Sequence, residues 1–234
     1  MIFVVDAGNR QHFATDLAAM HRQRKAVFVD RAGWNLPVVA DLEIDRYDLL
    51  EDTMYLLAKE EPSGPLLASA RLLTTTGPHL MQDLYPAAYQ PNLPSGPTVW
   101  EISRYCTAPG IAGRSRRLGL LWQIICGSVE AALEAGIDQV IFAANRALLP
   151  LALACGWDAR PVGAPMNDGD DEITAVVANI TLDGLREVRD RHGIRDSVLN
   201  LPARSAHPRP RHNPRDHLSG PDTVWDFSKF HEGT

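Results

Sequence analysis

The sequence has few cysteines, and their spacing excludes two kinds of site. Cys106, Cys126 and Cys155 are widely separated, odd in number and contain no Cys-x-x-Cys pair. Disulfide frameworks need paired cysteines, and structural zinc sites need closely spaced ligands. We therefore expect three buried free thiols and no metal site.

Long apolar runs are also lacking. No eighteen apolar residues occur together, and the apolar stretch 118–125 is too short to cross a bilayer. The first five residues are followed at once by Asp6, without the basic start and apolar core of a signal peptide. We expect no membrane span and a cytoplasmic protein.

Positive charge is in deficit. Lys and Arg total 23 against 29 Asp and Glu, which gives a formal net charge of −6. A nucleic acid would on average be repelled by such a chain, so we expect no nucleic-acid partner. The hydrophobic content of 45% is that of an ordinary globular protein with one sizeable core.

Hydrophobic periodicity predicts a mixed α/β fold with an antiparallel start and one strand–helix–strand crossover. A turn of composition Glu-Glu-Pro-Ser-Gly predicts a hairpin between its two flanking strands. Gly136 is a suitable C-cap for the crossover helix. Helices are expected at 11–28, 118–135 and 183–192, with a short one ending near Cys155; strands are expected at 53–59, 66–74, 98–107, 139–144 and 171–180.

The composition divides the chain after Pro202. Residues 203–234 are rich in Pro, Arg and His and lack periodicity, so they cannot build a core. We expect one domain over residues 1–202 and a flexible tail over residues 203–234.

Charged residues occur where apolar ones are expected. Arg24 falls in the middle of the apolar stripe of the first helix, and a buried guanidinium needs acidic partners. Arg71, Glu101 and Arg104 lie within otherwise apolar strands. Strict alternation would place Glu101 and Arg104 on opposite faces; either one faces solvent, or a β-bulge directs both to one cleft.

Two loops could bind ligands. The segment 27–48 combines aromatic rings with carboxylates, which suits a cation through cation–π and Coulomb attraction. The Arg/Gly-rich loop 109–119 lies between a strand and a helix, where backbone N–H groups and arginines can bind phosphate. Its setting resembles the phosphopantetheine-binding part of the GNAT acyltransferase fold, although the loop motif is degenerate.

Taken together, these residues resemble the acyl-homoserine-lactone (autoinducer) synthase family, which has a GNAT-like fold with a central mixed sheet. The resemblance covers about residues 1 to 190, and Thr74 replaces the proline that is usual there. The matching residues are Arg24, Phe28, Trp34, Glu43, Asp45, Tyr47, Asp48, Arg71 in Ser-Ala-Arg-Leu-Leu, and Glu101-Ile102-Ser103-Arg104.

The resemblance implies a quorum-sensing enzyme that acylates S-adenosylmethionine from an acyl thioester, carried by acyl-carrier protein or coenzyme A, and then forms a lactone with release of methylthioadenosine. No tightly bound cofactor is implied. S-adenosylmethionine would lie near Arg24, Phe28, Trp34, Asp45 and Asp48. The catalytic residues would be Glu101 as the base, with Asp48 the second choice, together with Arg71 and Arg104.

The acyl donor would occupy the other half of the site. Its phosphopantetheine arm would meet Ser103, Tyr105, Arg114, Arg116 and Arg117, and its chain a pocket formed by Trp100, Trp122, Phe142, Ala143 and Ala144. Because the strand at 139–145 has no hydroxyl group, we expect unsubstituted acyl donors to be preferred over 3-oxo donors. The alternatives are an ordinary GNAT acetyltransferase and a ligand-binding module without turnover.

Overall fold

The computed structural model describes residues 1–84, 93–168 and 171–200. One compact unit spans Met1–Leu201. The tail expected over residues 203–234 lies outside the described residues.

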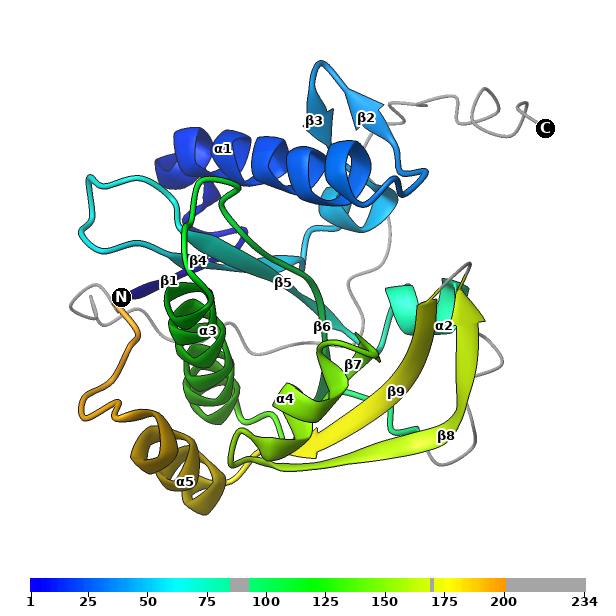
Figure 1. The fold of residues 1–234 in the computed structure, drawn as a ribbon, viewed down its shortest axis with the longest axis vertical. Coiled ribbons are helices and arrows are strands. Elements are labelled where there is room, and N and C mark those ends of the chain that lie inside the picture. The colour runs from blue at the N-terminus through cyan, green and yellow to red at the C-terminus, as the bar shows by residue number, and fades with distance from the viewer. Residues whose placement is uncertain (85–92, 169–170, 201–234) are drawn as a thin grey trace, which may run out of the picture. The chain divides into compact units, whose positions relative to one another are not determined.

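A seven-stranded mixed sheet forms the centre of this unit (Figure 1). β6 and β7 are parallel, and all other neighbouring strands are antiparallel. The strands follow the order β1 (Ile2–Val5), β4 (Met54–Ala58), β5 (Ala68–Thr74), β6 (Val99–Thr107), β7 (Gln139–Asn145), β9 (Asp171–Asn179) and β8 (Asp158–Asp168). The mixed α/β class, the β4–β5 hairpin and the β6–α3–β7 crossover are confirmed.

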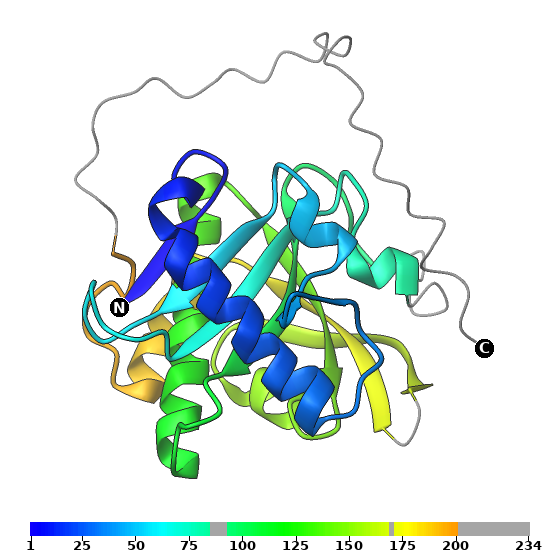
Figure 2. The same cartoon turned by 90° about the horizontal axis from the view of Figure 1, so that it is seen from above.

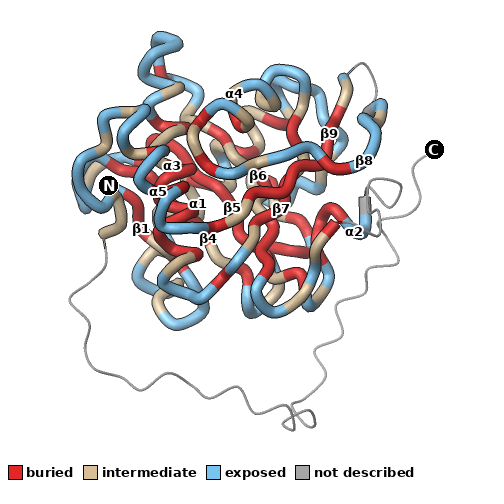
Figure 3. Tube along the Cα trace, turned by 90° about the horizontal axis from the view of Figure 1, so that it is seen from below, coloured by how far each residue is buried: buried red, intermediate tan, exposed pale blue. Residues whose placement is uncertain are grey.

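Helices cover both faces of the sheet. α1 (Ala14–Arg24) packs its apolar stripe on Phe3, Val5 and Tyr55 of the sheet. α3 (Arg114–Ala135) and α5 (Leu182–His192) lie on the opposite face, in the cluster that contains the strand residues Ile2 and Leu56. Figure 2 looks onto the α1 side, and Figure 3 shows that most strand residues between these layers are buried.

The remaining elements are short. α1 follows a 3-10 turn (Arg10–Phe13) and runs into a π-helix (Lys25–Arg31). A second 3-10 turn covers Arg46–Leu49. The others are α2 (Leu80–Leu84), α4 (Leu149–Ala154) and a separate two-stranded sheet of β2 (Val38–Val39) and β3 (Leu42–Glu43).

Several features of the secondary structure were predicted wrongly or missed, among them the short strand β1. α3 begins at Arg114, four residues before the predicted start, so the arginines expected in a loop lie in its first turns. β8 was not predicted, because Pro161 and Pro165 disfavour a strand; it forms at the edge of the sheet, where proline is tolerated. The predicted end of α3 is confirmed, since Gly136 has a left-handed conformation (φ 72°).

A β-bulge distorts β6 in the middle of the sheet. Between Ser69 and Arg71 of β5, the partner residue on β6 moves from Cys106 to Ser103, so β6 contains an extra residue. Arg104 lies in this bulge with a φ of 54°, a conformation uncommon for a residue with a side chain. The bulge thus turns Arg104 to the face of the sheet that also carries Glu101, as in the second alternative, and of the two residues Arg104 lines the cavity described below.

The parallel pair β6 and β7 separates beyond this region. Their pairing extends from Val99 and Gln139 to Glu101 and Ile141 and then ends. Backbone groups of β6 beyond Glu101 on its β7 side are consequently outside the ladder. The opening between the two strands therefore leads from the α1 face of the sheet to its α3 face.

Candidate active site

Arg24 is fully buried at the junction between α1 and the π-helix. Its Nη1 and Nη2 donate to the two carboxylate oxygens of Asp48, both at 2.8 Å, and its Nε donates to Glu43. A bidentate contact of this kind fixes both orientation and charge. Burial favours the neutral form of Arg24, but its hydrogen bonds to Asp48 raise its pKa above the ordinary value, so it stays charged.

The acidic partners are held by their own backbone. Asp45 is the N-cap of the 3-10 turn and accepts from the backbone N–H groups of Tyr47 and Asp48 at 3.0 and 3.3 Å. The Asp48 side chain accepts from the Asp45 N–H at 2.9 Å, which completes a capping box. This local motif holds two carboxylates, three positions apart in the sequence, above the sheet.

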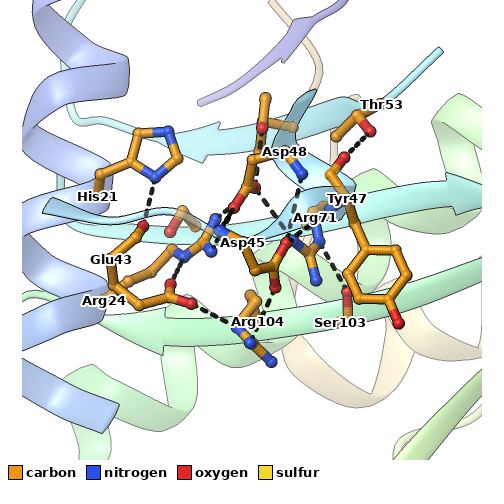
Figure 4. A network of polar contacts seen from close by, with 12 residues as sticks. His21, Arg24, Glu43, Asp45, Tyr47, Asp48, Thr53, Arg71, Ser103 and Arg104 are labelled. Atoms are coloured by element: carbon orange, nitrogen blue, oxygen red, sulfur yellow. Dashed lines mark hydrogen bonds and ion pairs between the residues drawn. The ribbon is translucent and has the colours of Figure 1, made fainter. Parts of the chain in front are cut away.

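Two arginine side chains from the sheet point toward these carboxylates (Figure 4). Arg71 of β5 donates to Asp45 at 2.5 Å and to Asp48 at 3.1 Å, and its Nε donates to the Ser103 hydroxyl at 3.1 Å. Arg104, turned by the bulge, donates to Asp45 at 2.9 Å and to Glu43 at 3.3 Å. We call Arg24, Arg71, Arg104, Glu43, Asp45 and Asp48 the charge cluster.

The charge cluster is balanced, with three arginines and three carboxylates, all buried. Burial would raise the pKa of Asp48, but the hydrogen bonds and charge of Arg24, assisted by Arg71, lower it far below the ordinary range. Asp48 also accepts from the Tyr55 hydroxyl at 3.0 Å. With its oxygens engaged and its proton affinity lowered, Asp48 is a weak base.

Glu101 differs from these carboxylates. It is fully buried on β6 opposite Leu73, and its Oε2 accepts from the Met81 N–H at 2.7 Å. Burial raises its pKa to about 7, against the lowering effects of the Met81 hydrogen bond and of the Arg71 charge. A carboxylate with this pKa can take up and release a proton near neutrality.

Two buried polar atoms, one in the charge cluster and one outside it, have no hydrogen-bond partner among the described residues. They are Nη2 of Arg71, a donor, and Oε1 of Glu101, an acceptor. An unsatisfied buried polar group is costly in a stable protein and is typical of a site that a ligand completes. Nη2 of Arg71 can therefore donate to an oxygen, and Oε1 of Glu101 can accept from a protonated nitrogen.

Aromatic rings line the approach to the cluster. Phe28, from the π-helix, is buried and stacks on Trp34 with 5.0 Å between ring centroids, while Trp34 is 44% exposed. The Arg104 guanidinium lies 5.9 Å from the Phe28 ring centroid. The predicted Phe28 and Trp34 are thus brought together at the edge of the charge cluster.

A cavity of about 140 Å³ passes between β6 and β7. Phe28, Trp34 and Arg104 line it on the α1 side of the sheet, and Leu121 and Ile124 of α3 line it on the other side. The full lining is Phe28, Trp34, Ile102, Ser103, Arg104, Tyr105, Leu121, Ile124, Ile125, Ser128, Phe142, Ala143, Leu148, Ala152 and Trp157. The cavity therefore connects a charged site to an apolar interior.

The predicted acyl-pocket residues are divided by the structure. Phe142 and Ala143 line the cavity, whereas Trp100 and Ala144 lie in the main hydrophobic core and are absent from the lining. Trp122 faces a separate surface hollow and stacks on His192 at 4.1 Å.

The predicted residues for the phosphopantetheine arm are also divided. Ser103 and Tyr105 line the cavity, and burial raises the pKa of Tyr105 well above 10, so its hydroxyl keeps its proton. Arg114 lies at the start of α3 beside the surface hollow. Arg116 pairs with Glu60 at 2.8 Å, and Arg117 donates to the Ile111 carbonyl at 3.1 Å.

Sequence reasoning missed the part of the lining that comes from helices. Leu121, Ile124, Ile125 and Ser128 recur at helical spacing on α3, and Leu148 and Ala152 lie in or beside α4. The spacing of the α3 residues indicates a buried face, but a buried face of a core helix looks the same whether it meets a sheet or a cavity. Among the described residues no group of His, Cys, Asp and Glu could hold a metal ion.

Comparisons with known proteins agree on one family. Residues 9–188 match the autoinducer synthase family. An acyl-homoserine-lactone synthase from Rhizobium etli is 34% identical over 144 residues, 61% of this chain and 68% of that protein, and one from Ralstonia solanacearum is 33% identical over 166 residues, 68% and 79% of the two chains. The structure of BjaI, a CoA-dependent acyl-homoserine lactone synthase with MTA, superposes with a TM-score of 0.75 at 31% identity, covering 85% of this chain and 92% of that one.

Proposed function

The chain belongs to the autoinducer synthase family and is an acyl-homoserine-lactone synthase, and we propose that the charge cluster binds its S-adenosylmethionine while the cavity between β6 and β7 holds its acyl chain. The enzyme transfers an acyl group from a thioester to the amine of S-adenosylmethionine and then closes the lactone with release of methylthioadenosine. One observation carries the assignment of the two sites: the cavity crosses the sheet from Arg104 of the charge cluster to apolar residues of α3, as a polar substrate joined to an acyl chain requires.

The charge cluster would bind S-adenosylmethionine through an arginine, with aromatic rings beside it. Its carboxylates are engaged by arginines, so their main effect is to hold those arginines in place. The unpaired Nη2 of Arg71 would donate to the methionyl carboxylate. The Phe28 and Trp34 rings would face the sulfonium, which is a cation without hydrogen-bond donors and suits an aromatic surface.

Glu101 is the proposed general base for the first step. Its free Oε1 would accept a proton from the α-amine as the nitrogen attacks the thioester carbonyl carbon. The C–S bond then breaks, and the departing thiolate takes up this proton and leaves as the thiol. Asp48, the second choice, is less suited because its oxygens are occupied and its pKa is lowered. Backbone N–H groups of β6 outside the β7 ladder would stabilise the oxyanion.

The second step is intramolecular. An oxygen of the substrate carboxylate attacks its own γ-carbon, the bond from that carbon to the sulfonium breaks, and the sulfur leaves as a neutral thioether. Holding the substrate chain curled supplies much of the rate of such a step. Buried carboxylates fix Arg24 through a bidentate contact and Arg104 in the β-bulge. These contacts give the site the rigidity that a curled substrate requires.

The raised pKa of Glu101 predicts a pH dependence. As a base, Glu101 must be deprotonated in the free enzyme, so kcat/KM is expected to fall as the pH drops through about 7, tending to a tenfold loss per pH unit. A pH profile of kcat/KM from pH 5.5 to 9 measures this, with stability followed in parallel. A profile that is flat down to pH 5.5 would assign the proton to another group.

Stoichiometry tests the overall reaction. Methylthioadenosine and acyl-homoserine lactone are expected in equal amounts when S-adenosylmethionine and an acyl thioester are supplied together. Chromatography of the products with mass detection measures both. A product that keeps its adenosyl group would indicate plain N-acylation, as in an ordinary GNAT acyltransferase, and no product would indicate a binding module.

The carrier of the acyl group is a further proposal. Arg114, Arg116 and Arg117 lie in the first turn of α3. A phosphate of the phosphopantetheine arm would lie at this helix N-terminus. Acyl-CoA and acyl-carrier protein share this arm, and an acidic carrier protein would in addition meet the exposed Arg116. Comparing kcat/KM for the same acyl group on the two carriers, at low and high salt, distinguishes them.

The cytoplasmic location stays a prediction. α3 is long and apolar enough to cross a membrane by length and composition, but 61% of its most apolar window is buried, and it is the core helix of the crossover. Cell fractionation with detection of the chain in the soluble fraction tests the location.

A further inference from the structure

The α3 wall of the cavity carries one hydroxyl group. Leu121, Ile124, Ile125 and Ser128 form the α3 side of the lining, and Ser128 is only 1% exposed. The other described polar lining residues, Ser103, Arg104 and Tyr105, all come from β6. Ser128 is therefore a separate polar point within an apolar part of the cavity.

Ser128 lies toward the closed end of the opening between the strands. A right-handed crossover brings α3 back antiparallel to β6, so later turns of α3 lie nearer to the segment in which β6 and β7 are paired. Ser128 is the last of the four α3 lining residues along the chain. An acyl chain entering from the charge cluster would thus pass along this wall.

Ser128 lines the cavity, and its hydroxyl oxygen keeps capacity to accept a hydrogen bond. Its proton is donated to the Ile124 carbonyl at 2.8 Å, one turn earlier in the helix. No hydrogen bond to Ser128 Oγ is found among the described residues. A hydroxyl oxygen can accept as well as donate, so its remaining lone pairs are free for a ligand.

Building on the assignment of this cavity as the acyl pocket, we propose that Ser128 is a specificity-determining residue that accepts a hydrogen bond from a hydroxyl group on the acyl chain. A hydroxyacyl chain leaves the bond from Ser128 to Ile124 intact. An oxo group has no proton to donate, so Ser128 would have to turn away from Ile124 to serve it. An unsubstituted chain neither gains nor loses a hydrogen bond.

This geometry sets an order among acyl donors. One net hydrogen bond corresponds to about a five- to tenfold difference in an equilibrium or a specificity ratio. We therefore expect kcat/KM for a 3-hydroxyacyl donor to exceed that for the matching 3-oxoacyl donor by about fivefold. The expected preference for unsubstituted over 3-oxo donors is tested in the same comparison.

The test compares three donors of equal length, unsubstituted, 3-hydroxy and 3-oxo, on the wild type and on Ser128→Ala. The variant should lower kcat/KM for the 3-hydroxy donor about five- to tenfold and leave the unsubstituted donor within about twofold. Ser63→Ala, in the exposed turn between β4 and β5, is the matched control and should change neither. Circular dichroism and Tm verify that each variant is folded.

Three outcomes overturn the inference. They are a wild type that prefers the 3-oxo donor, a Ser128→Ala protein with an unchanged ratio of 3-hydroxy to 3-oxo donors, and an equal loss with all three donors, which would indicate a structural role. Failure of the acyl-pocket assignment looks different, because then Ala143→Phe, which adds bulk to the wall of this cavity, would leave kcat/KM unchanged for all three donors.

Discussion

Replacing Glu101 by glutamine is expected to lower kcat by about 10²- to 10⁴-fold, the usual contribution of a positioned general base. Glutamine retains the shape of the side chain and an oxygen that can accept from the Met81 N–H, so the local structure should persist. It cannot take up the proton of the substrate amine. Steady-state rates of methylthioadenosine release measure the loss, and KM for S-adenosylmethionine should change far less than kcat.

The residual activity of Glu101→Gln carries further information. If Glu101 is the base, the fall of kcat/KM below about pH 7 should disappear in the variant, because the group responsible for it has been removed. Glu134→Gln, which alters an exposed carboxylate on α3, is the control and should retain the wild-type rate and profile. Near-normal turnover by a folded Glu101→Gln protein would remove Glu101 from this role.

Much of the fold was predictable because its elements are locally determined. The apolar stripe of α1, the turn between β4 and β5, and the glycine at the end of α3 each act over a few residues. The mixed sheet followed from these elements. β8 was missed because its pairing with β9 over Asp158–Asp168 outweighs two prolines, and tertiary pairing of this kind leaves no local pattern.

The members of the charge cluster could be named from sequence, but their contacts could not. A charged residue within an apolar stripe or strand is expensive unless it is paired, so Arg24 and Arg71 had to meet carboxylates. The pairing itself depends on the bulge at Arg104 and the capping box at Asp45, which bring four segments together. Whether these residues bind S-adenosylmethionine stays a prediction.

The acyl cavity was the least predictable part. It exists because β6 and β7 stop pairing after Glu101 and Ile141, and a gap between strands depends on packing across the whole sheet. Trp100 and Ala144 were expected there from the resemblance to the family. Both pack in the main core instead. Trp100 lies where β6 and β7 are still paired, and Ala144 lies on the same face of β7 as the lining residue Phe142 but outside the cavity.

Arg24→Ala is expected to reduce both stability and activity, because Arg24 satisfies two of the three carboxylates in the charge cluster. Removing the Arg24 side chain takes away the hydrogen bond from Arg24 Nε to Glu43 and the two hydrogen bonds to Asp48, in a region closed to solvent. Breaking one partner from a buried ionic network costs about 3–5 kcal/mol in free energy of unfolding. Urea denaturation followed by circular dichroism measures this cost.

Arg24→Lys separates charge from geometry. Lysine restores the positive charge but cannot bind Asp48 through two parallel hydrogen bonds while also reaching Glu43, so only part of the stability should return. Arg186→Ala is the matched control, because Arg186 and Asp183 form an exposed pair on α5 whose loss should cost less than about 1 kcal/mol. Turnover should fall with Arg24→Ala even at low temperature, where the variant remains folded, since the freed carboxylates no longer hold Arg71 and Arg104 in a fixed arrangement. An Arg24→Ala protein within about 1 kcal/mol of wild type would show that water or neighbouring groups satisfy Asp48, and the cluster would then be less tightly coupled than its contacts indicate.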